Sequence, residues 1–233
     1  MRTVLITGAS GGIGSATARA FHREGYRVVL HYCHNKAAAE TLRTELPNSE
    51  LFRADLSISE ELLALAEAFP ETDVLINNAA VSLFSLFDLV TPEQEKEIYD
   101  TNLLAPVRLS RAMLKHMLPR KRGCILNVSS YFAKTGGSCE ADYSAAKAGL
   151  IGLTKALAKE VGPAGIRVNC VCPGIIRTPM NDRLTVEEEQ SLMEEIPLDR
   201  FGDPEEVAAA LLFLAGDGAS YINGAVVDVD GGI

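Results

Sequence analysis

The fold is decided by residues 2–14, Arg-Thr-Val-Leu-Ile-Thr-Gly-Ala-Ser-Gly-Gly-Ile-Gly. The apolar run Arg2–Ile6 predicts a buried strand, and the pattern Gly12–Glu24 predicts a helix that ends at Gly25. Four of the seven residues from Gly8 to Gly14 are glycine, which permits a tight turn and lets backbone N–H groups approach a pyrophosphate at a helix N-terminus. This order of elements predicts nucleotide binding; a glycine-rich turn without a ligand is the alternative.

Strand-like and helix-like segments alternate along the rest of the chain. Further strands are expected at Arg27–Tyr32, Glu50–Ala54, Asp73–Asn77, Cys124–Val128, Arg167–Val171 and Ala225–Val229. Further helices are expected at Lys36–Leu46, Ser59–Phe69, Pro92–Met117 (one or two, with Pro106 between them), Tyr143–Val161 and Pro204–Ala215. Strands rich in Val, Ile and Leu that alternate with helices predict a doubly wound, Rossmann-type α/β fold: a seven-stranded parallel sheet with helices on both faces. The stretch Pro173–Asp203 is expected to be irregular, with a lid at about 176–203.

Composition limits the class of protein. The 233 residues are 47% hydrophobic and 23% charged, which predicts one globular domain spanning 1–233. A net charge of -9 argues against nucleic acid or an anionic membrane as a partner. A strand that begins at residue 2 leaves no room for a signal peptide, and no apolar run approaches the roughly 20 residues of a spanning helix.

The five cysteines are odd in number and lack the spacing of a disulfide framework, so we expect free thiols and a cytoplasmic location. Cys170 and Cys172 lie two apart on a predicted strand, but no second pair of ligands accompanies them. We therefore expect no metal site.

Tyr143 and Lys147 lie four residues apart at the start of a predicted helix, so their side chains share one face. A phenol has an ordinary pKa of about 10, and a neighbouring ammonium should lower it. Tyr143 is therefore a candidate general acid or base, with Ser129 or Ser130 at the preceding strand end as a hydroxyl donor. The alternative is a solvated helix face.

In a doubly wound sheet, ligands bind outside the carboxyl ends of the strands. The second strand ends in His31-Tyr32-Cys33-His34, without the Asp or Glu that would hold a ribose 2′-hydroxyl and repel a 2′-phosphate. We therefore expect NADP(H), leave NAD(H) open, and expect His31, His34 and Lys36 to face the phosphate. Histidines that are merely on the surface are the alternative.

Three further strand ends carry candidate contacts. Asp55, before Leu56, can accept from an adenine amino group or cap the next helix through Ser57 or Ser59. The sequence Asn77-Asn78-Ala79-Ala80 can tie neighbouring loops together or contact the ribose. The turn Pro173-Gly174-Ile175-Ile176-Arg177-Thr178 can place backbone groups and Thr178 on a nicotinamide carboxamide.

Together these segments resemble the short-chain dehydrogenase/reductase family. The matching motifs occur in family order along the whole chain: Thr7-Gly8-x-x-x-Gly12-x-Gly14, Asp55-Leu56, Asn77-Asn78-Ala79, Asn102, Ser130, Tyr143-x-x-x-Lys147, Pro173-Gly174 and Asp230-Gly231-Gly232. Two positions depart from the pattern. Ala80 stands where many members have glycine, and Gly11 stands where many NADP-dependent members have arginine.

The resemblance implies a role for each site residue. Tyr143 would protonate the developing alkoxide, and Ser130, thirteen positions before it, would hydrogen-bond the carbonyl oxygen. Lys147 would favour ionisation of Tyr143 and bind the nicotinamide ribose, and Asn102 would fix a water that relays protons to Lys147. The residues implied to contact the cofactor are Gly8, Ser10, Gly11, Gly12, Ile13, Gly14, His31, Tyr32, Asp55, Leu56, Asn78, Ala79, Ala80, Tyr143, Lys147, Pro173, Gly174, Ile176 and Thr178.

Within the family, segments 150–155, 165–169, 204–208 and 219–224 are most similar to 3-oxoacyl-(acyl-carrier-protein) reductases of fatty acid biosynthesis. This implies NADPH-dependent reduction of a 3-oxoacyl thioester, with acyl carrier protein as a candidate partner. The dense basic segment Pro119–Arg122 is expected at the opposite edge of the sheet, and Ala164 stands where some of these reductases have arginine. Apolar lid residues favour an acyl chain: Met180, Leu184, Leu192, Met193, Ile196 and Leu198.

The resemblance also implies a homotetramer, assembled through the helix bearing Tyr143 and Lys147 and through the last strand. Ala156, Leu157, Val161 and the strand residues Val226–Val229 are apolar enough for this, although they can equally be core. Two other functions remain open: a dehydrogenase for a sugar, polyol or other small alcohol, and a cofactor-sensing protein without turnover.

Overall fold

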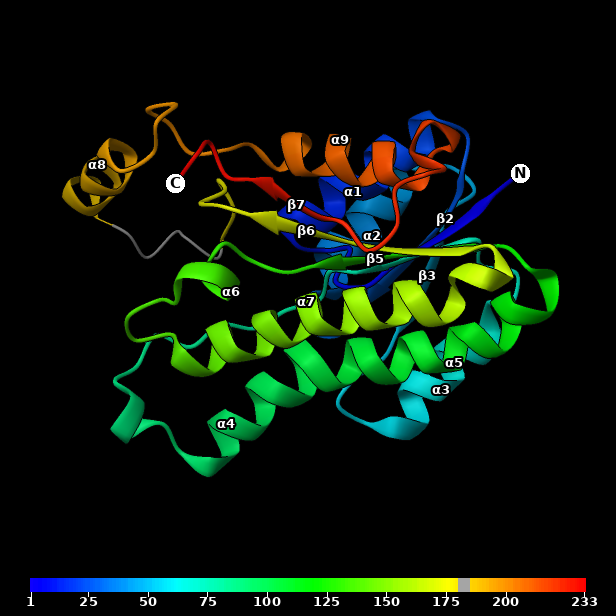
Figure 1. Cartoon of the computed structure of the whole chain (residues 1–233), viewed down its shortest axis with the longest axis horizontal. Coiled ribbons are helices and arrows are strands. Elements are labelled where there is room, and N and C mark those ends of the chain that lie inside the picture. The colour runs from blue at the N-terminus through cyan, green and yellow to red at the C-terminus, as the bar shows by residue number, and fades with distance from the viewer. Residues whose placement is uncertain (180–184) are drawn as a thin grey trace.

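In the computed structural model, which describes residues 1–179 and 185–233, seven parallel strands form one sheet in the order β3-β2-β1-β4-β5-β6-β7 (Figure 1). The strands are β1 (Thr3–Ile6), β2 (Arg27–Tyr32), β3 (Glu50–Arg53), β4 (Val74–Asn77), β5 (Gly123–Val128), β6 (Ile166–Pro173) and β7 (Val226–Val229). The predicted doubly wound parallel fold is confirmed. The strand order reverses its direction of growth between β1 and β4, which is where such sheets bind ligands.

Helices cover both faces of this sheet (Figure 1). One layer contains α1 (Gly12–Arg23), α2 (Lys36–Glu45) and α9 (Pro204–Ala215). The other contains α3 (Ser59–Ala68), α5 (Ala105–Arg120) and α7 (Ala141–Val161), with α4 (Pro92–Tyr99) running on from α5. Because both faces are covered, the inner strands must bury side chains in two directions.

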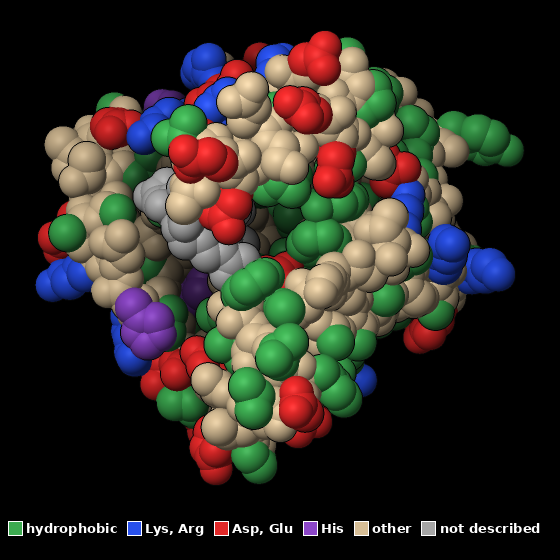
Figure 2. Space-filling model, turned by 90° about the vertical axis from the view of Figure 1, so that its left-hand side faces the viewer, with side chains coloured by type: hydrophobic (Ala, Val, Ile, Leu, Met, Phe, Trp, Pro, Cys, Tyr) green, Lys and Arg blue, Asp and Glu red, His purple; other side chains and the backbone are tan. Residues whose placement is uncertain are grey.

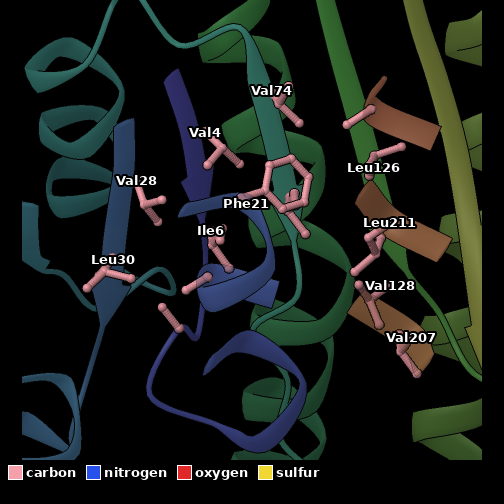
Figure 3. Packing of buried hydrophobic residues seen from close by; sticks show 14 of the residues in the cluster. Val4, Ile6, Phe21, Val28, Leu30, Val74, Leu126, Val128, Val207 and Leu211 are labelled. Atoms are coloured by element: carbon pink, nitrogen blue, oxygen red, sulfur yellow. The ribbon is translucent and has the colours of Figure 1, made fainter. Parts of the chain in front are cut away.

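The strand side chains alternate between two cores. Val4 and Ile6 of β1 lie in the cluster under α1 and α9, whereas Leu5 lies in the cluster under α3 and α5. Figure 3 shows Phe21 of α1 beside Ile6 and Val74 in the first cluster. This two-residue period explains why the strands read as continuous apolar runs in the sequence.

Two helices were absent from the sequence prediction: α6 (Phe132–Thr135) and α8 (Val186–Glu194). The prediction of an irregular stretch from Pro173 to Asp203 was therefore wrong over α8. A capping box starts this helix: Thr185 Oγ1 accepts from the Glu188 N–H at 3.2 Å, and the Glu188 carboxylate accepts from the Thr185 N–H at 2.8 Å. Thr-x-x-Glu is the sequence signal that could have identified it.

The expected break near Pro106 is a π-helical segment, Asp100–Leu104, that joins α4 to α5. Pro106 has no N–H to donate to the carbonyl of Asn102 four residues earlier, so the α-helical pattern cannot continue there. The Ala105 N–H instead bonds the Asp100 carbonyl. Segments of this kind occur frequently at functional sites.

The lid segment has an apolar core of its own. Ile175, Ile196 and Phe201 form it, and Leu192 and Met193 of α8 pack against them. These lid side chains therefore serve the segment itself, which weakens the inference from them to an acyl chain. Leu198 is 62% exposed, and the expected lid residues Met180 and Leu184 lie outside the described residues.

Candidate active site

The predicted site residues gather at the carboxyl ends of the strands, the edge that also carries α6 and α8 (Figure 1). Figure 2 looks directly onto this face. It is hollowed near its centre, where hydrophobic and acidic side chains border the hollow, while Lys and Arg lie mostly at the margins. A ligand that enters here meets apolar and negatively charged surface.

The glycine turn brings β1, α1 and the segment after β6 into close contact. Gly8 has a φ of +64°, a conformation that favours glycine. A Cβ on Gly14 would lie 2.3 Å from the Gly8 carbonyl oxygen, and one on Gly12 would lie 2.6 Å from Cγ2 of Thr178. The first turn of α1 carries no acidic side chain, so its N–H groups suit an anion. The turn therefore fits a pyrophosphate, with Ser10 half-buried and Gly11 exposed at its tip.

The loop after β4 is tied to this turn by Asn78 and Ala79. The Asn78 side chain donates to the carbonyls of Thr7 at 2.9 Å and Gly8 at 3.2 Å. The N–H groups of Asn78 and Ala79 both donate to Thr7 Oγ1, at 2.9 and 3.0 Å. Asn78 therefore has the first of the two roles that the sequence left open, which is to tie neighbouring loops together. Ala80, two residues later, is half-buried.

The expectation that His31 faces a 2′-phosphate is wrong. His31 is 2% exposed, its Nδ1 accepts from the Gly8 N–H at 3.1 Å, and its Nε2 lies 3.0 Å from the Ala54 carbonyl. Burial lowers the pKa of His31 to about 4. A neutral, fully engaged imidazole cannot attract a phosphate, whereas His34 is exposed three residues later.

At the next strand end, the side chain of Asp55 bonds Ser57, and α3 begins after Ile58 without a side-chain cap. Asp55 Oδ1 accepts from the N–H of Ser57 at 2.9 Å and from its hydroxyl at 2.7 Å, and the hydroxyl bond lowers the pKa of Asp55. The neighbouring Leu56 is buried in the core, as Tyr32 is at the end of β2. Backbone groups of these residues remain candidates for cofactor contact.

The turn after β6 lies against the end of β7. The Gly174 N–H donates to the Val229 carbonyl at 3.0 Å, and a Cβ on Gly174 would lie 2.7 Å from the Asp230 Cα. Pro173 accepts from the Tyr131 N–H at 2.9 Å, and Ile176 is buried. Glycine is therefore needed at 174 for this close approach.

Tyr143 and Ser130 meet at the start of α7, as the resemblance implies. Tyr143 is 9% exposed, and the nearby Ser130 hydroxyl acts to lower its pKa. Ser130 Oγ also accepts from the Phe132 N–H at 3.2 Å, which fixes its position. Ser129, the rejected neighbour, points elsewhere: its hydroxyl donates to the Lys147 carbonyl at 2.8 Å. The pair places two hydroxyl groups where one carbonyl oxygen can reach both.

The expected lowering of the Tyr143 pKa does not occur in the free protein. Burial raises the pKa of Tyr143, the Glu140 carboxylate raises it further, and the Ser130 hydrogen bond only partly offsets both. Lys147 is itself buried, its ammonium lies 5.6 Å from the Tyr143 ring centroid, and it donates to the Val128 carbonyl at 2.8 Å. Burial lowers the pKa of Lys147 to about 8. Burial thus disfavours the charged form of both groups, although Lys147 still carries its proton at neutral pH.

The Asn102 side chain is committed to the backbone of the loop after β4. It is fully buried, its Oδ1 accepts from the Val81 N–H at 2.9 Å, and its Nδ2 donates to the Val81 carbonyl at 2.8 Å. A water relay through this amide is therefore not supported. The backbone carbonyl, which Pro106 cannot pair, is the group of Asn102 that can hold a water.

A pocket beside Tyr143 contains two acidic residues that sequence reasoning missed. Glu140 and Asp142 line it together with Tyr143 and Ser85, and Asp142 accepts from the Tyr99 hydroxyl at 3.2 Å. Its apolar lining is Leu83, Phe87, Val90, Ile98, Cys139 and Ala141. The sequence signal was present, since Glu140-Ala141-Asp142 directly precedes Tyr143. The surface beside Tyr143 is therefore partly apolar and partly negative.

Three findings concern the wider molecule. All five cysteines are free thiols. Across residues 1–179 and 185–233, no three His, Cys, Asp or Glu side chains are grouped to hold a metal ion. Within the same described ranges, none of the helices combines the length and apolarity needed to cross a bilayer.

Comparison with known proteins agrees with this geometry. Residues 8–233 match the family described as enoyl-(acyl carrier protein) reductase. The chain is 38% identical over 232 residues to the 3-oxoacyl-[acyl-carrier-protein] reductase FabG of Rickettsia felis, covering 100% of this chain and 96% of the relative. It is 40% identical over 237 residues to nodulation protein G of Rhizobium sp. strain N33, covering 100% and 96%.

Among solved structures, a short-chain dehydrogenase/reductase family protein superposes with a TM-score of 0.93 at 33% identity, covering 99% of this chain and 96% of that one. The similarity thus spans the sheet, the glycine turn and the Tyr143 region together. The chain belongs to the short-chain dehydrogenase/reductase family of oxidoreductase enzymes.

Proposed function

We propose that this enzyme uses NADPH to reduce a 3-oxoacyl thioester to the 3-hydroxyacyl thioester. The proximity of Tyr143 to Ser130 carries the proposal, together with the apolar side chains of Leu83, Phe87 and Ile98 beside Tyr143. The hydroxyl pair suits a carbonyl oxygen, and the apolar wall suits an acyl chain. Similarity to the FabG reductase supports the same substrate class.

Each side chain has a defined task in this reaction. The bound nicotinamide supplies the hydride. As the carbonyl oxygen gains negative charge, Ser130 stabilises it with a hydrogen bond and Tyr143 gives it a proton. The tyrosinate that results lies near the Lys147 ammonium, which the Val128 carbonyl holds in place. Because water is largely excluded from both buried groups, this attraction is stronger than it would be at the surface.

The test is NADPH oxidation with acetoacetyl thioesters of N-acetylcysteamine, coenzyme A and acyl carrier protein. Tyr143→Phe should reduce kcat by roughly 10²- to 10⁴-fold, the range for loss of a general acid. Tyr221→Phe is a matched control, because Tyr221 is fully exposed. Turnover by wild type on none of these thioesters, or full activity in Tyr143→Phe, would disprove the proposal.

A second candidate is a small polar carbonyl compound or its alcohol, such as a sugar or polyol. Ser85, Glu140 and Asp142 face the pocket beside Tyr143 and favour polar groups over a long acyl chain. The two carboxylates would also repel an anionic substrate, including a carrier of acidic charge. The cofactor-sensing alternative is set aside because the family is one of enzymes.

A panel of ketones matched in size, one neutral, one anionic and one bearing an amine, separates these candidates. The second candidate requires kcat/KM to be higher for the neutral and cationic ketones than for the thioesters. In Asp142→Asn the rate on the anionic ketone should rise, because one repelling charge is lost. A strong preference for acyl thioesters throughout would exclude the second candidate.

We further propose NADP(H) as the cofactor, on the evidence that no carboxylate ends β2 and that Cys33 and exposed His34 stand there. The test is the ratio of kcat/KM for NADPH and NADH in wild type and in Cys33→Asp. The added carboxylate should repel a 2′-phosphate and hold a 2′-hydroxyl, shifting the ratio toward NADH. A wild type that prefers NADH would refute this assignment.

The basic segment is a poor candidate for docking acyl carrier protein. Arg122 pairs with buried Asp73 at 2.6 Å, and Arg120 donates to the Thr72 carbonyl. Both lie where β4 and β5 begin, at the edge away from Tyr143. We therefore expect thioesters of the carrier protein to be no better than those of N-acetylcysteamine, a comparison that the thioester assay makes directly.

We also propose that the protein is a cytoplasmic homotetramer. One contact between subunits would be β7, which lies at one edge of the sheet and pairs only with β6. Of the expected contact residues, Ala156 is exposed and Val226 is half-buried, whereas Val161 is core. Light scattering at micromolar concentration tests the assembly, and a monomer would refute it.

A further inference from the structure

We propose that His31 is a positioning residue for the cofactor: its imidazole latches the glycine turn to the end of β3 and so sets the turn for the pyrophosphate. The inference rests on the proposed dinucleotide function of that turn. His31 belongs to β2, between the two segments that it joins, since the sheet order there is β3-β2-β1.

Three contacts of His31 make the latch. Its Nδ1 accepts from the Gly8 N–H at 3.1 Å, its Nε2 lies 3.0 Å from the Ala54 carbonyl, and its own carbonyl accepts from the Ala9 N–H at 2.9 Å. Because a backbone N–H can only donate, Nδ1 must be unprotonated, so Nε2 carries the hydrogen and donates to Ala54. A neutral imidazole offers one donor and one acceptor on opposite sides, which an aliphatic side chain cannot do.

The latch also decides which amides of the turn are free for a ligand. The N–H groups of Gly8 and Ala9 bond His31, and that of Gly11 bonds the Gly8 carbonyl at 3.1 Å. The first-turn N–H groups of α1, from Gly12 onward, have no partner within the helix. We therefore infer that the pyrophosphate is bound by the start of α1, and that Gly8 serves it only by holding the turn in shape.

The opposite side of the turn is held independently. Asn78 donates to the Thr7 and Gly8 carbonyls, and a Cβ on Gly8 would lie 2.8 Å from the Ala79 Cα. Gly8 is thus held between His31 and the loop after β4. Loss of His31 would free one side of the turn and leave Tyr143, Ser130 and Lys147 untouched, so binding should suffer while chemistry does not.

The test compares His31→Leu, His31→Gln and the control Tyr221→Phe, whose side chain is fully exposed. NADPH dissociation constants are measured by fluorescence without substrate, and KM and kcat in the full assay. His31→Leu should raise the NADPH dissociation constant and KM roughly tenfold, the equivalent of about one lost hydrogen bond and its ordering effect. The kcat at saturating NADPH should stay within about twofold, because binding alone is lost. The glutamine, with a donor and an acceptor, should restore much of the affinity, and Tyr221→Phe should behave as wild type.

An unchanged dissociation constant in His31→Leu, or a fall in kcat with KM unchanged, would overturn the inference alone. Absence of NADPH binding by wild type would refute the proposed function and this inference with it. If His31→Leu does not fold, nitrogen NMR of the wild-type imidazole tests the latch instead. The proposal requires the hydrogen on Nε2 and none on Nδ1, and this tautomer must persist when NADPH is added. A hydrogen on Nδ1 would overturn the latch.

Discussion

Replacing Lys147 by methionine tests the energetic cost of the buried ammonium. Burial lowers the pKa of Lys147 to about 8, against 10.5 for an exposed lysine. Between these values the unfolded chain keeps a proton that the folded protein has released. Unfolding then takes up a proton, so the stability of wild type rises with pH across this window. The gap between the two pKa values corresponds to about 3 kcal/mol of stability that wild type lacks at neutral pH.

Methionine removes this cost and introduces another. It fills a similar length of the core without charge, but it leaves the Val128 carbonyl without the 2.8 Å bond to Lys147. An unsatisfied buried acceptor costs about 1–3 kcal/mol. We therefore expect the stability of Lys147→Met at neutral pH to lie between that of wild type and about 2 kcal/mol above it, while the oxidoreductase activity is lost.

Urea denaturation of the cofactor-free protein, followed by circular dichroism, measures the effect. From about pH 7 to about pH 9.5, the stability of Lys147→Met relative to wild type should fall by about 2 kcal/mol, because only wild type gains from the release of this proton. Lys155→Met, on the exposed side of α7, should show no such trend. A stability difference that stays constant with pH would refute the argument that burial controls Lys147.

Three further predictions concern the parts that hold the site together. Gly14→Ala would place a Cβ 2.3 Å from the Gly8 carbonyl oxygen, so thermal unfolding should show a loss of stability of about 1–3 kcal/mol. Gly152→Ala has no atom within 4 Å of the new Cβ and should be up to about 1 kcal/mol more stable than wild type. Asn102→Leu removes both bonds to Val81 and leaves two backbone groups unpaired, so urea denaturation should show a loss of at least about 2 kcal/mol. Asn223→Leu removes two similar bonds at an exposed position, and a larger loss there would contradict this reasoning. The pKa of His31 in the folded protein is about 4, below its ordinary value of 6.5, so the folded state resists protonation of this side chain. As the pH falls from 6.5 to about 4, the unfolding free energy of wild type should therefore decrease by up to about 3 kcal/mol relative to His31→Gln. Stability curves that stay parallel over this pH range would exclude this.

Local patterns predicted most of the fold. Hydrophobic period, glycine and proline placed every strand of the sheet, because most strands are short apolar runs between two layers of helices. The helix α8 was missed because its apolar residues are few; its capping box, Thr185 with Glu188, was the readable signal. A break near Pro106 was expected from the sequence, but its form, a π-helical segment at Asp100–Leu104, needed the observed helix path.

The roles of site side chains were predicted less well, and the failures share one cause. His31 bonds Gly8 across 23 positions of sequence, and Asn102 bonds Val81 across 21. The direction of the Tyr143 pKa depended on burial, which outweighs a lysine one helical turn away. The spacing of residues along the sequence shows neither how deeply a side chain is buried nor which distant group it pairs with.

The sequence by itself determined the order of strands and helices, the glycine turn after the first strand, and the shared helix face of Tyr143 and Lys147, because backbone preference and periodicity act over a few residues. Only the tertiary structure decided that His31 is a latch rather than a phosphate ligand, that Asn102 supports a loop, and that Glu140 and Asp142 share the pocket of Tyr143. Those outcomes depend on which distant backbone groups meet and how much water remains beside them, and both are fixed only when the sheet and its helices have packed.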